Sequence, residues 1–103
     1  LAAAFKRRNR GVGFVEAEAR NKPEALAAAK SGAEAVLLDN FSLPALKETV
    51  AHLRSMEKNI VIEASGGITH ENAGAYLAAG VDFVSMGALT LFSKPVDMRL
   101  ELV

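Results

Sequence analysis

The stretch Ile62-Glu63-Ala64-Ser65-Gly66-Gly67-Ile68-Thr69 contains an apolar run, a carboxylate and a glycine pair ahead of an expected helix. Phosphate binds where backbone N–H groups can be approached closely, and a helix N-terminus adds the positive end of its dipole. We therefore predict that Ser65, Gly66 and Gly67 form a phosphate-binding loop, with Glu63 contacting substrate beside it. A strand that leads through such a loop into a helix is the repeating unit of β/α folds.

A second candidate loop, Met86-Gly87-Ala88-Leu89-Thr90, follows the apolar run 83–86. We expect it to belong to a second strand–helix unit of the same kind, in which Gly87 and Ala88 contact phosphate. Paired phosphate-binding loops in consecutive units are typical of the last part of many β/α barrels. The alternative for each loop is a tight turn that binds no ligand.

The rest of the chain is predicted to alternate between strands and helices. Apolar runs predict strands, and apolar residues at helical spacing between capping and breaking residues predict helices. The predicted strands are 13–19, 35–38, 60–62 and 83–86, and the predicted helices are 21–32, 43–56 and 69–79. Residues 97–103 alternate apolar and polar side chains and are expected to form a final strand.

Continuous apolar strands indicate a parallel sheet that helices cover. Four or five strands cannot close an eight-stranded barrel, and an open arc would leave two sheet edges unpaired. We therefore predict an α/β fold of partial β/α barrel type, with parallel strands alternating with helices, that forms the C-terminal portion of a barrel. A small free-standing doubly wound sheet is the competing architecture.

The composition argues against several classes of function. Twelve basic residues balance twelve acidic ones, so the chain offers no electrostatic argument for binding nucleic acid or an anionic membrane surface. The absence of cysteine excludes disulfides and thiolate metal sites, and it is consistent with a cytoplasmic location. No apolar run approaches the ~20 residues that a membrane-spanning helix needs.

Acidic residues recur near the ends of successive predicted strands. Glu16 and Glu18 lie in the first strand, Asp39 ends the second, and Glu63 precedes the loop of the third. Ligands of parallel β/α folds bind at the carboxyl edge of the sheet. Carboxylates there can accept hydrogen bonds from sugar hydroxyls, hold Mg²⁺ through water or stabilise positive charge on a sugar ring. A solvated or ion-paired role is the alternative for each acid taken alone.

Together these residues resemble the quinolinate phosphoribosyltransferases, also called carboxylating nicotinate-nucleotide pyrophosphorylases. The resemblance runs in order and at matching spacing along nearly the whole chain. The matching segments are 15–18, 37–41, 63–69, 80–82, 85–90 and 96–100.

The resemblance implies transfer of a phosphoribosyl group from phosphoribosyl pyrophosphate to quinolinate, with release of pyrophosphate and CO₂. The product would be nicotinate mononucleotide, an intermediate of NAD biosynthesis. The resemblance further implies that Glu18 and Asp39 are the catalytic acids, which meet the ribose hydroxyls and a Mg²⁺ ion directly or through water. Ser65, Gly66 and Gly87 match the loops that hold the 5′-phosphate. A cytoplasmic, homo-oligomeric pentosyltransferase is implied as well.

Two departures from the family pattern are visible. Leu91 stands where many members have histidine, and the basic residues that line the family's quinolinate pocket belong to segments that this chain lacks. We therefore expect residues 1–103 to be the C-terminal segment of an α/β-barrel phosphoribosyltransferase domain, without the N-terminal domain and first barrel strands, and to be inactive alone. Two alternatives stay open: another phosphate-binding β/α-barrel enzyme, or a non-catalytic barrel fragment that assembles with another chain.

Overall fold

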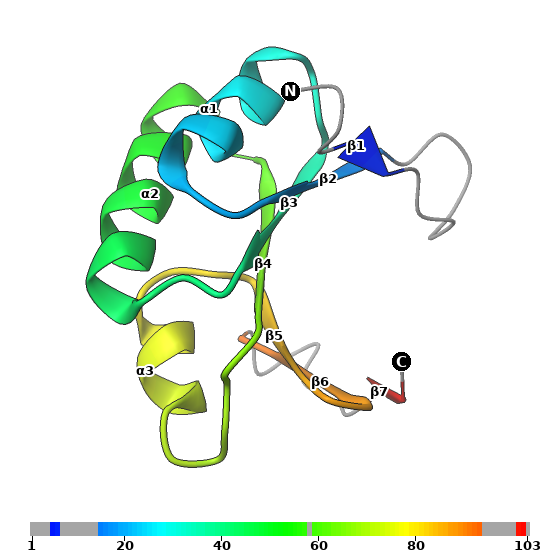
Figure 1. The fold of residues 1–103 in the computed structure, drawn as a ribbon, viewed down its shortest axis with the longest axis vertical. Coiled ribbons are helices and arrows are strands. Elements are labelled where there is room, and N and C mark those ends of the chain that lie inside the picture. The colour runs from blue at the N-terminus through cyan, green and yellow to red at the C-terminus, as the bar shows by residue number, and fades with distance from the viewer. Residues whose placement is uncertain (1–4, 7–14, 58, 94–100, 103) are drawn as a thin grey trace.

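A computed structural model describes residues 5–6, 15–57, 59–93 and 101–102 of the chain. Strands and helices alternate along its middle part (Figure 1). The strands are β1 (Phe5–Lys6), β2 (Glu16–Ala19), β3 (Ala35–Asp39), β4 (Val61–Ser65), β5 (Phe83–Met86), β6 (Leu89–Phe92) and β7 (Glu101–Leu102). The helices are α1 (Lys22–Lys30), α2 (Leu43–Met56) and α3 (Ala73–Ala78). None of the described helices combines the length and the hydrophobicity that crossing a membrane requires.

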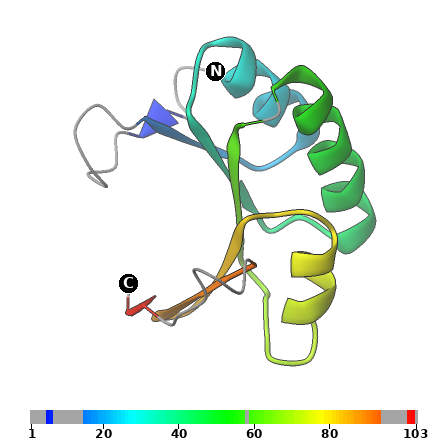
Figure 2. The same ribbon diagram turned by 180° about the vertical axis from the view of Figure 1, so that it is seen from behind.

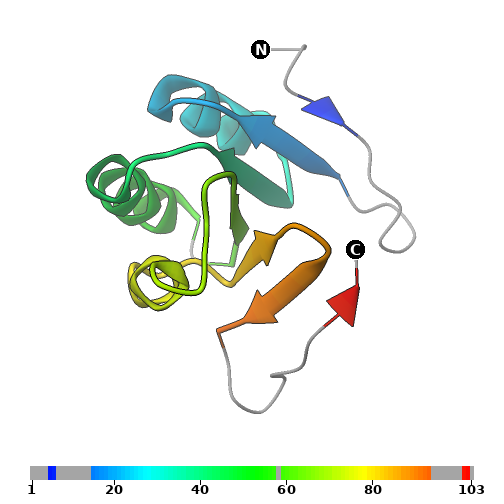
Figure 3. The ribbon, with the colours of Figure 1, turned by 60° about the horizontal axis from the view of Figure 1, so that its bottom comes forward.

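The described strands form one sheet in which they follow one another in chain order. The four strands from β2 to β5 are parallel, whereas β1, β6 and β7 pair antiparallel with their neighbours. The three described helices lie on one side of the sheet, which curls away from them (Figure 2, Figure 3). Consecutive strand order with helices on one side is the arrangement of a β/α barrel, so the predicted partial barrel is confirmed.

The doubly wound alternative is wrong for the same reasons. A doubly wound sheet reverses its strand order at a switch point and carries helices on both faces. The described part of this chain does neither, because the strand order never reverses and the helices share one face (Figure 3).

Local sequence chemistry sets the ends of the first two helices. The Asn21 side chain accepts a hydrogen bond from the Glu24 N–H at 2.9 Å, and Gly32, with φ +94°, follows the end of α1. The Ser42 hydroxyl accepts from the Ala45 N–H at 3.4 Å and caps α2. Such side chains satisfy backbone donors that have no partner inside the helix. Both predicted helices are confirmed, α2 with the predicted bounds.

The third helix begins later than predicted. The helix expected from Thr69 starts only at Ala73, and residues 70–72 form a turn. The Asn72 side-chain oxygen accepts from the Thr69 N–H at 2.8 Å, while its Nδ2 donates to the Gly67 carbonyl at 3.0 Å. An asparagine that bonds nearby backbone groups competes with helical hydrogen bonds. The predicted first turn of this helix is therefore wrong.

The chain leaves β5 through a hairpin rather than into a helix. β6 returns antiparallel to β5, and Gly87, with φ +61°, lies in the turn between them. Two-residue hairpin turns favour positive φ, which glycine adopts without strain. The expected second strand–helix unit is therefore wrong. Strand β7 lies within the predicted final strand, of which residues 97–100 and 103 are outside the described residues.

The two faces of the parallel strands differ in chemistry, because successive side chains point to opposite sides of a strand. One set of alternate residues packs into the core with the helices: Ala17, Ala19, Val36, Leu38, Ile62, Ala64 and Val84. The other set defines the helix-free face, which carries Glu16, Glu18, Leu37, Asp39, Glu63, Ser65, Phe83 and Ser85. The polar side chains of the strands therefore lie on the face that the helices do not cover.

Arg54 of α2 ties the amino ends of β4 and β5 to the helix layer. Its guanidinium donates to the carbonyls of Ile60 and Gly80, and it forms an ion pair with Asp82 at 3.0 Å. The same Asp82 oxygen accepts from the Ile62 N–H at 2.8 Å. This network fixes the end of the sheet that lies opposite the predicted ligand-binding edge.

Candidate active site

Glu18 and Asp39 lie on the helix-free face of neighbouring strands. Glu18 pairs with Leu37 across the sheet, and Asp39 is the residue two positions beyond Leu37 on β3. The two acids are therefore diagonal neighbours, and the ordinary spacing of strands and residues in a sheet places the Cα atoms of such neighbours roughly 8 Å apart. Both are partly buried. The structure thus brings together the two acids that the sequence predicts as the catalytic pair.

Glu16 occupies a different place from the one expected. It shares the helix-free face with Glu18, but it begins β2 and is fully buried. Its partner in the sheet, Ala35, likewise begins β3. Glu16 is therefore at the amino end of the sheet, and the prediction that places it near the carboxyl edge is wrong.

Asp39 and Ser65 connect the second acid to the glycine loop. They are register partners at the carboxyl ends of β3 and β4, and the Ser65 hydroxyl donates a hydrogen bond to the Asp39 carboxylate at 3.2 Å. A second link lies beside it, because the Asn40 backbone N–H donates to the Ser65 carbonyl at 2.9 Å. Two adjacent strand ends are therefore held together by one side-chain bond and one backbone bond.

Ser65, Gly66 and Gly67, which we call the glycine turn, follow directly from β4. Gly66 has φ +84° and Gly67 has φ +72°, a region that glycine enters without strain. Within the described part of the chain, neither glycine N–H donates a hydrogen bond to another protein group. These N–H groups are available to an anion at the carboxyl edge of the sheet.

The late start of α3 changes how such an anion would be held. Because the turn 70–72 separates Gly67 from Ala73, the helix N-terminus does not adjoin the glycine turn. The backbone N–H groups, rather than the helix dipole, are then the main attraction for phosphate. In the same turn, hydrogen bonds from its own backbone and from Thr69 lower the pKa of exposed Glu71.

Glu63 is buried on the helix-free face, two residues before Ser65. Its carboxylate accepts a hydrogen bond from the Ser85 hydroxyl of β5 at 2.6 Å. A carboxylate accepts hydrogen bonds but repels phosphate. Contact with a sugar hydroxyl, rather than with phosphate, is therefore the form of substrate binding that suits Glu63, and its role as a substrate residue stays a prediction.

Gly87 and Ala88 are exposed in the β5–β6 turn. Because β5 is parallel to β4, this turn leaves the sheet at the same carboxyl edge as the glycine turn. The helix expected behind it is replaced by β6, so no helix dipole supports this loop. Phosphate contact by Gly87 and Ala88 stays a prediction that rests on their position at this edge.

The acid pair offers oxygen donors of the kind that a magnesium ion binds. Carboxylate and hydroxyl oxygens are ligands that Mg²⁺ accepts, and this ion commonly keeps several of its waters. Among the described residues, no group of three or more acids and histidines is close enough to hold a metal on its own. Magnesium binding by Glu18 and Asp39 therefore stays a prediction, in which the two carboxylates would supply only part of the ion's coordination.

Sequence reasoning missed four residues that shape this edge, which are Asn40, Asn72, Tyr76 and Ser85. The Tyr76 hydroxyl is one example, because it donates to the buried Phe41 carbonyl at 2.9 Å and so holds the loop that follows Asp39. Asparagine directly after a strand or before a helix is a recognisable turn signal. The contact of Tyr76 crosses from α3 to the β3–α2 loop and has no local signature in the sequence.

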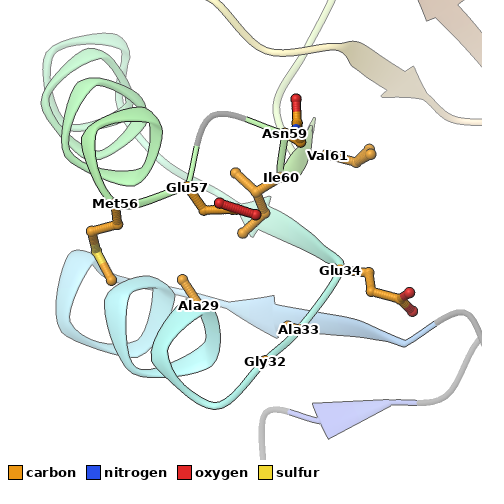
Figure 4. A pocket seen from close by; sticks show the side chains of 9 residues that line it. All are labelled: Ala29, Gly32, Ala33, Glu34, Met56, Glu57, Asn59, Ile60 and Val61. Atoms are coloured by element: carbon orange, nitrogen blue, oxygen red, sulfur yellow. The ribbon is translucent and has the colours of Figure 1, made fainter.

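A pocket of about 540 Å³ lies at the opposite end of the sheet. Its lining comes from the ends of α1 and α2 and from the residues that lead into β3 and β4 (Figure 4). Among these residues are Glu34, Glu57 and Ile60. It does not include any residue of the acid pair or of the glycine turn.

The fold and the site together define a class of protein: a β/α-barrel chain with acids and a phosphate-type turn at the carboxyl edge of its parallel strands. Residues 2–101 match the family described as quinolinate phosphoribosyl transferase, C-terminal domain. The chain therefore belongs to this family.

Curated relatives agree with that membership. The chain is 41% identical over 90 residues to a probable nicotinate-nucleotide pyrophosphorylase (carboxylating) of Methanothermobacter thermautotrophicus, covering 85% of this chain and 32% of the relative. It is 40% identical over 88 residues to the human nicotinate-nucleotide pyrophosphorylase (carboxylating), covering 85% of this chain and 30% of that protein. The chain thus spans about a third of the length of these relatives.

Solved structures of the same enzyme share the fold. The nicotinate-nucleotide pyrophosphorylase of Francisella tularensis superimposes with a TM-score of 0.65 at 33% identity, over 87% of this chain and 32% of that one. The enzyme from Ehrlichia chaffeensis gives a TM-score of 0.66 at 25% identity, over 78% of this chain and 28% of that one. Both matches cover most of this chain and less than a third of the solved chain.

Proposed function

We propose that the protein containing this chain transfers phosphoribosyl from phosphoribosyl pyrophosphate to quinolinate, giving nicotinate mononucleotide, pyrophosphate and CO₂. The observation that carries the proposal is the hydrogen bond between Asp39 and Ser65. This bond links an acid that can accept hydrogen bonds from ribose hydroxyls to a turn that can bind the 5′-phosphate of the same ribose. The two residues lie on adjacent strands and on the same face of the sheet. The names of the relatives support the same reaction.

The chemistry assigned to these residues follows from charge. As pyrophosphate leaves, positive charge develops on the ribose ring, and the carboxylates of Glu18 and Asp39 stabilise it. The N–H groups of Gly66 and Gly67 hold the 5′-phosphate, so the sugar is fixed between the acids and the glycine turn. Gly87 and Ala88 approach the same phosphate from the next loop. Bound Mg²⁺ would offset the charge of the pyrophosphate.

We further propose that the 103 residues supply only the ribose-phosphate side of the active site. Quinolinate carries two carboxylates, which need cationic partners when they are removed from water. The four parallel strands contain no lysine, arginine or histidine. The cationic side of the site would come from other segments of the native protein or from a second subunit, which makes a homo-oligomer the expected assembly. A cytoplasmic location is expected with it.

The test is an assay of the native gene product with phosphoribosyl pyrophosphate, quinolinate and Mg²⁺. We expect formation of nicotinate mononucleotide, release of CO₂ and loss of both when Mg²⁺ is chelated. A native gene product that binds neither substrate would contradict the proposal. The 103-residue chain, assayed in parallel, should form no product. If this chain alone forms nicotinate mononucleotide, the proposal that it supplies only the ribose-phosphate side of the active site is refuted.

A further inference from the structure

Asn40 has an unusual backbone for its residue type. Its φ of +61° makes it the one non-glycine residue with positive φ among those described. Asparagine enters this region more readily than most residues, but a strained conformation persists only where surrounding contacts hold it. Asn40 lies between Asp39, which belongs to the acid pair, and Phe41, whose carbonyl accepts the Tyr76 hydroxyl.

The side chain of Asn40 packs against the glycine turn. A Cβ built on Gly66 would lie 2.5 Å from Oδ1 of Asn40 and 2.9 Å from its Cγ. Both separations are shorter than a carbon atom can tolerate, so residue 66 must be glycine while the Asn40 amide occupies this place. At Gly67, by contrast, an added Cβ would meet nothing within 4 Å.

The backbone of Asn40 makes a second contact with the same turn. Its N–H donates to the Ser65 carbonyl at 2.9 Å, parallel to the bond between the Ser65 hydroxyl and Asp39. The side chain of residue 40 therefore contacts Gly66 and its backbone binds Ser65. Asn40 is therefore held against the glycine turn at two consecutive residues of that turn.

We propose that Asn40 is a positioning residue, which fixes the Asp39 carboxylate relative to the phosphate-binding glycine turn. The inference rests on the proposed function, since it concerns how far apart the ribose acid and the 5′-phosphate are held. Small displacements of a bound group from its productive geometry lower the rate strongly. Asn40 acts through Asp39 and Gly66 and needs no contact with substrate.

Asn40→Gly in the native gene product tests the role of the amide. Glycine keeps the positive φ and the N–H to Ser65, so only the side-chain contact with Gly66 is removed. We expect the KM for phosphoribosyl pyrophosphate to rise about tenfold and kcat to fall, while the KM for quinolinate stays unchanged. Asn59→Gly, at an exposed turn before β4, is the matched control and should leave all three values unchanged.

Two outcomes of that assay would overturn the inference. One is an unchanged KM for phosphoribosyl pyrophosphate in Asn40→Gly. The other is an equal rise of both KM values together with a lower melting temperature, since a general loss of structure would affect both substrates.

A double-mutant cycle tests the contact without any substrate. Gly66→Ala should lower the melting temperature less in the Asn40→Gly background than in the wild type, because the clash with the amide is gone. Strain from the positive φ of residue 66 and the contact with the Asn40 backbone should remain in both backgrounds. Additive changes would refute the inference. If the native protein forms no nicotinate mononucleotide, the proposed function fails, whereas this cycle still decides whether Asn40 and Gly66 are coupled.

Discussion

Ser65 at the end of β4 donates its hydroxyl to Asp39 at the end of β3, with 3.2 Å between the two oxygens. The bond joins two consecutive strand–helix units, and its two residues are 26 positions apart in the chain. An ionised carboxylate accepts hydrogen bonds and cannot donate them, so Asp39 keeps further acceptor positions for a sugar hydroxyl or hydrated metal. The same serine begins the glycine turn, which makes this pair the centre of the candidate site.

Asp39→Asn should lower kcat for phosphoribosyl transfer about 10²-fold or more. Asparagine has nearly the same size and can still accept the Ser65 hydroxyl, so the loss is that of negative charge beside the ribose. Steady-state kinetics of the native gene product measure the effect. Glu48→Gln removes a charge from an exposed residue of α2 and serves as control. Equal rates in wild type and Asp39→Asn would remove Asp39 from the catalytic residues.

Glu18→Gln should raise the Mg²⁺ concentration needed for half-maximal activity, in addition to lowering turnover. The diagonal placement of Glu18 and Asp39 lets both carboxylates contribute to one hydrated ion, and removing one charge weakens that attraction. A Mg²⁺ titration at saturating phosphoribosyl pyrophosphate measures the shift. A titration curve with an unchanged midpoint would show that Glu18 does not take part in metal binding.

Tyr76→Phe should lower the free energy of unfolding by about 1 kcal/mol. The substitution keeps the ring in the core but leaves the Phe41 carbonyl, at a buried position, without its donor. Chemical denaturation of the native gene product gives the difference. Tyr76→Leu, which also removes the ring, should lower the free energy of unfolding further, because a large buried side chain is replaced by a smaller one. If Tyr76→Phe unfolds like the wild type, the hydroxyl contributes nothing to the β3–α2 loop.

Arg54→Met should lower the free energy of unfolding by about 1–2 kcal/mol while leaving KM for both substrates unchanged. Methionine retains much of the apolar stem, so the loss reflects the bonds to Ile60, Gly80 and Asp82. The pair with Asp82 contributes only modestly, because both side chains are partly open to solvent. Lys22→Met, which breaks the more exposed pair with Glu48, should change stability by less than about 0.5 kcal/mol. Equal losses in the two variants would contradict this ranking.

Much of the fold could be predicted because its determinants are local. Strand β5 and helix α2 have the predicted bounds. Their apolar patterns lie within the segments, and the residues that end them lie directly beside the segments. The parallel pairing of strands β2 to β5 was predicted from their continuous apolar runs. The start of α3 was missed, because the Asn72 side chain competes with the helical hydrogen bonds of residues 69–72 and so delays the helix.

The hairpin after β5 was missed for a different reason. Gly87 is equally suited to a phosphate loop and to a hairpin turn, and the choice depends on whether Leu89–Phe92 finds a strand to pair with. Phe92 packs on Phe83 with ring centroids 5.2 Å apart, a cross-strand contact that sequence spacing does not reveal. Within the candidate site, the acids and glycines were predictable by residue type, whereas the supporting contacts of Asn40, Tyr76 and Ser85 were not.

Because the strands follow one another without reversal, neighbouring groups of the site are also neighbours in the gene. An insertion in one of the loops that connect the strands would displace the site residues of that loop. The site residues on the other strand ends would keep their register. In this architecture, a short contiguous stretch of coding sequence encodes all the strand ends at which the candidate site lies.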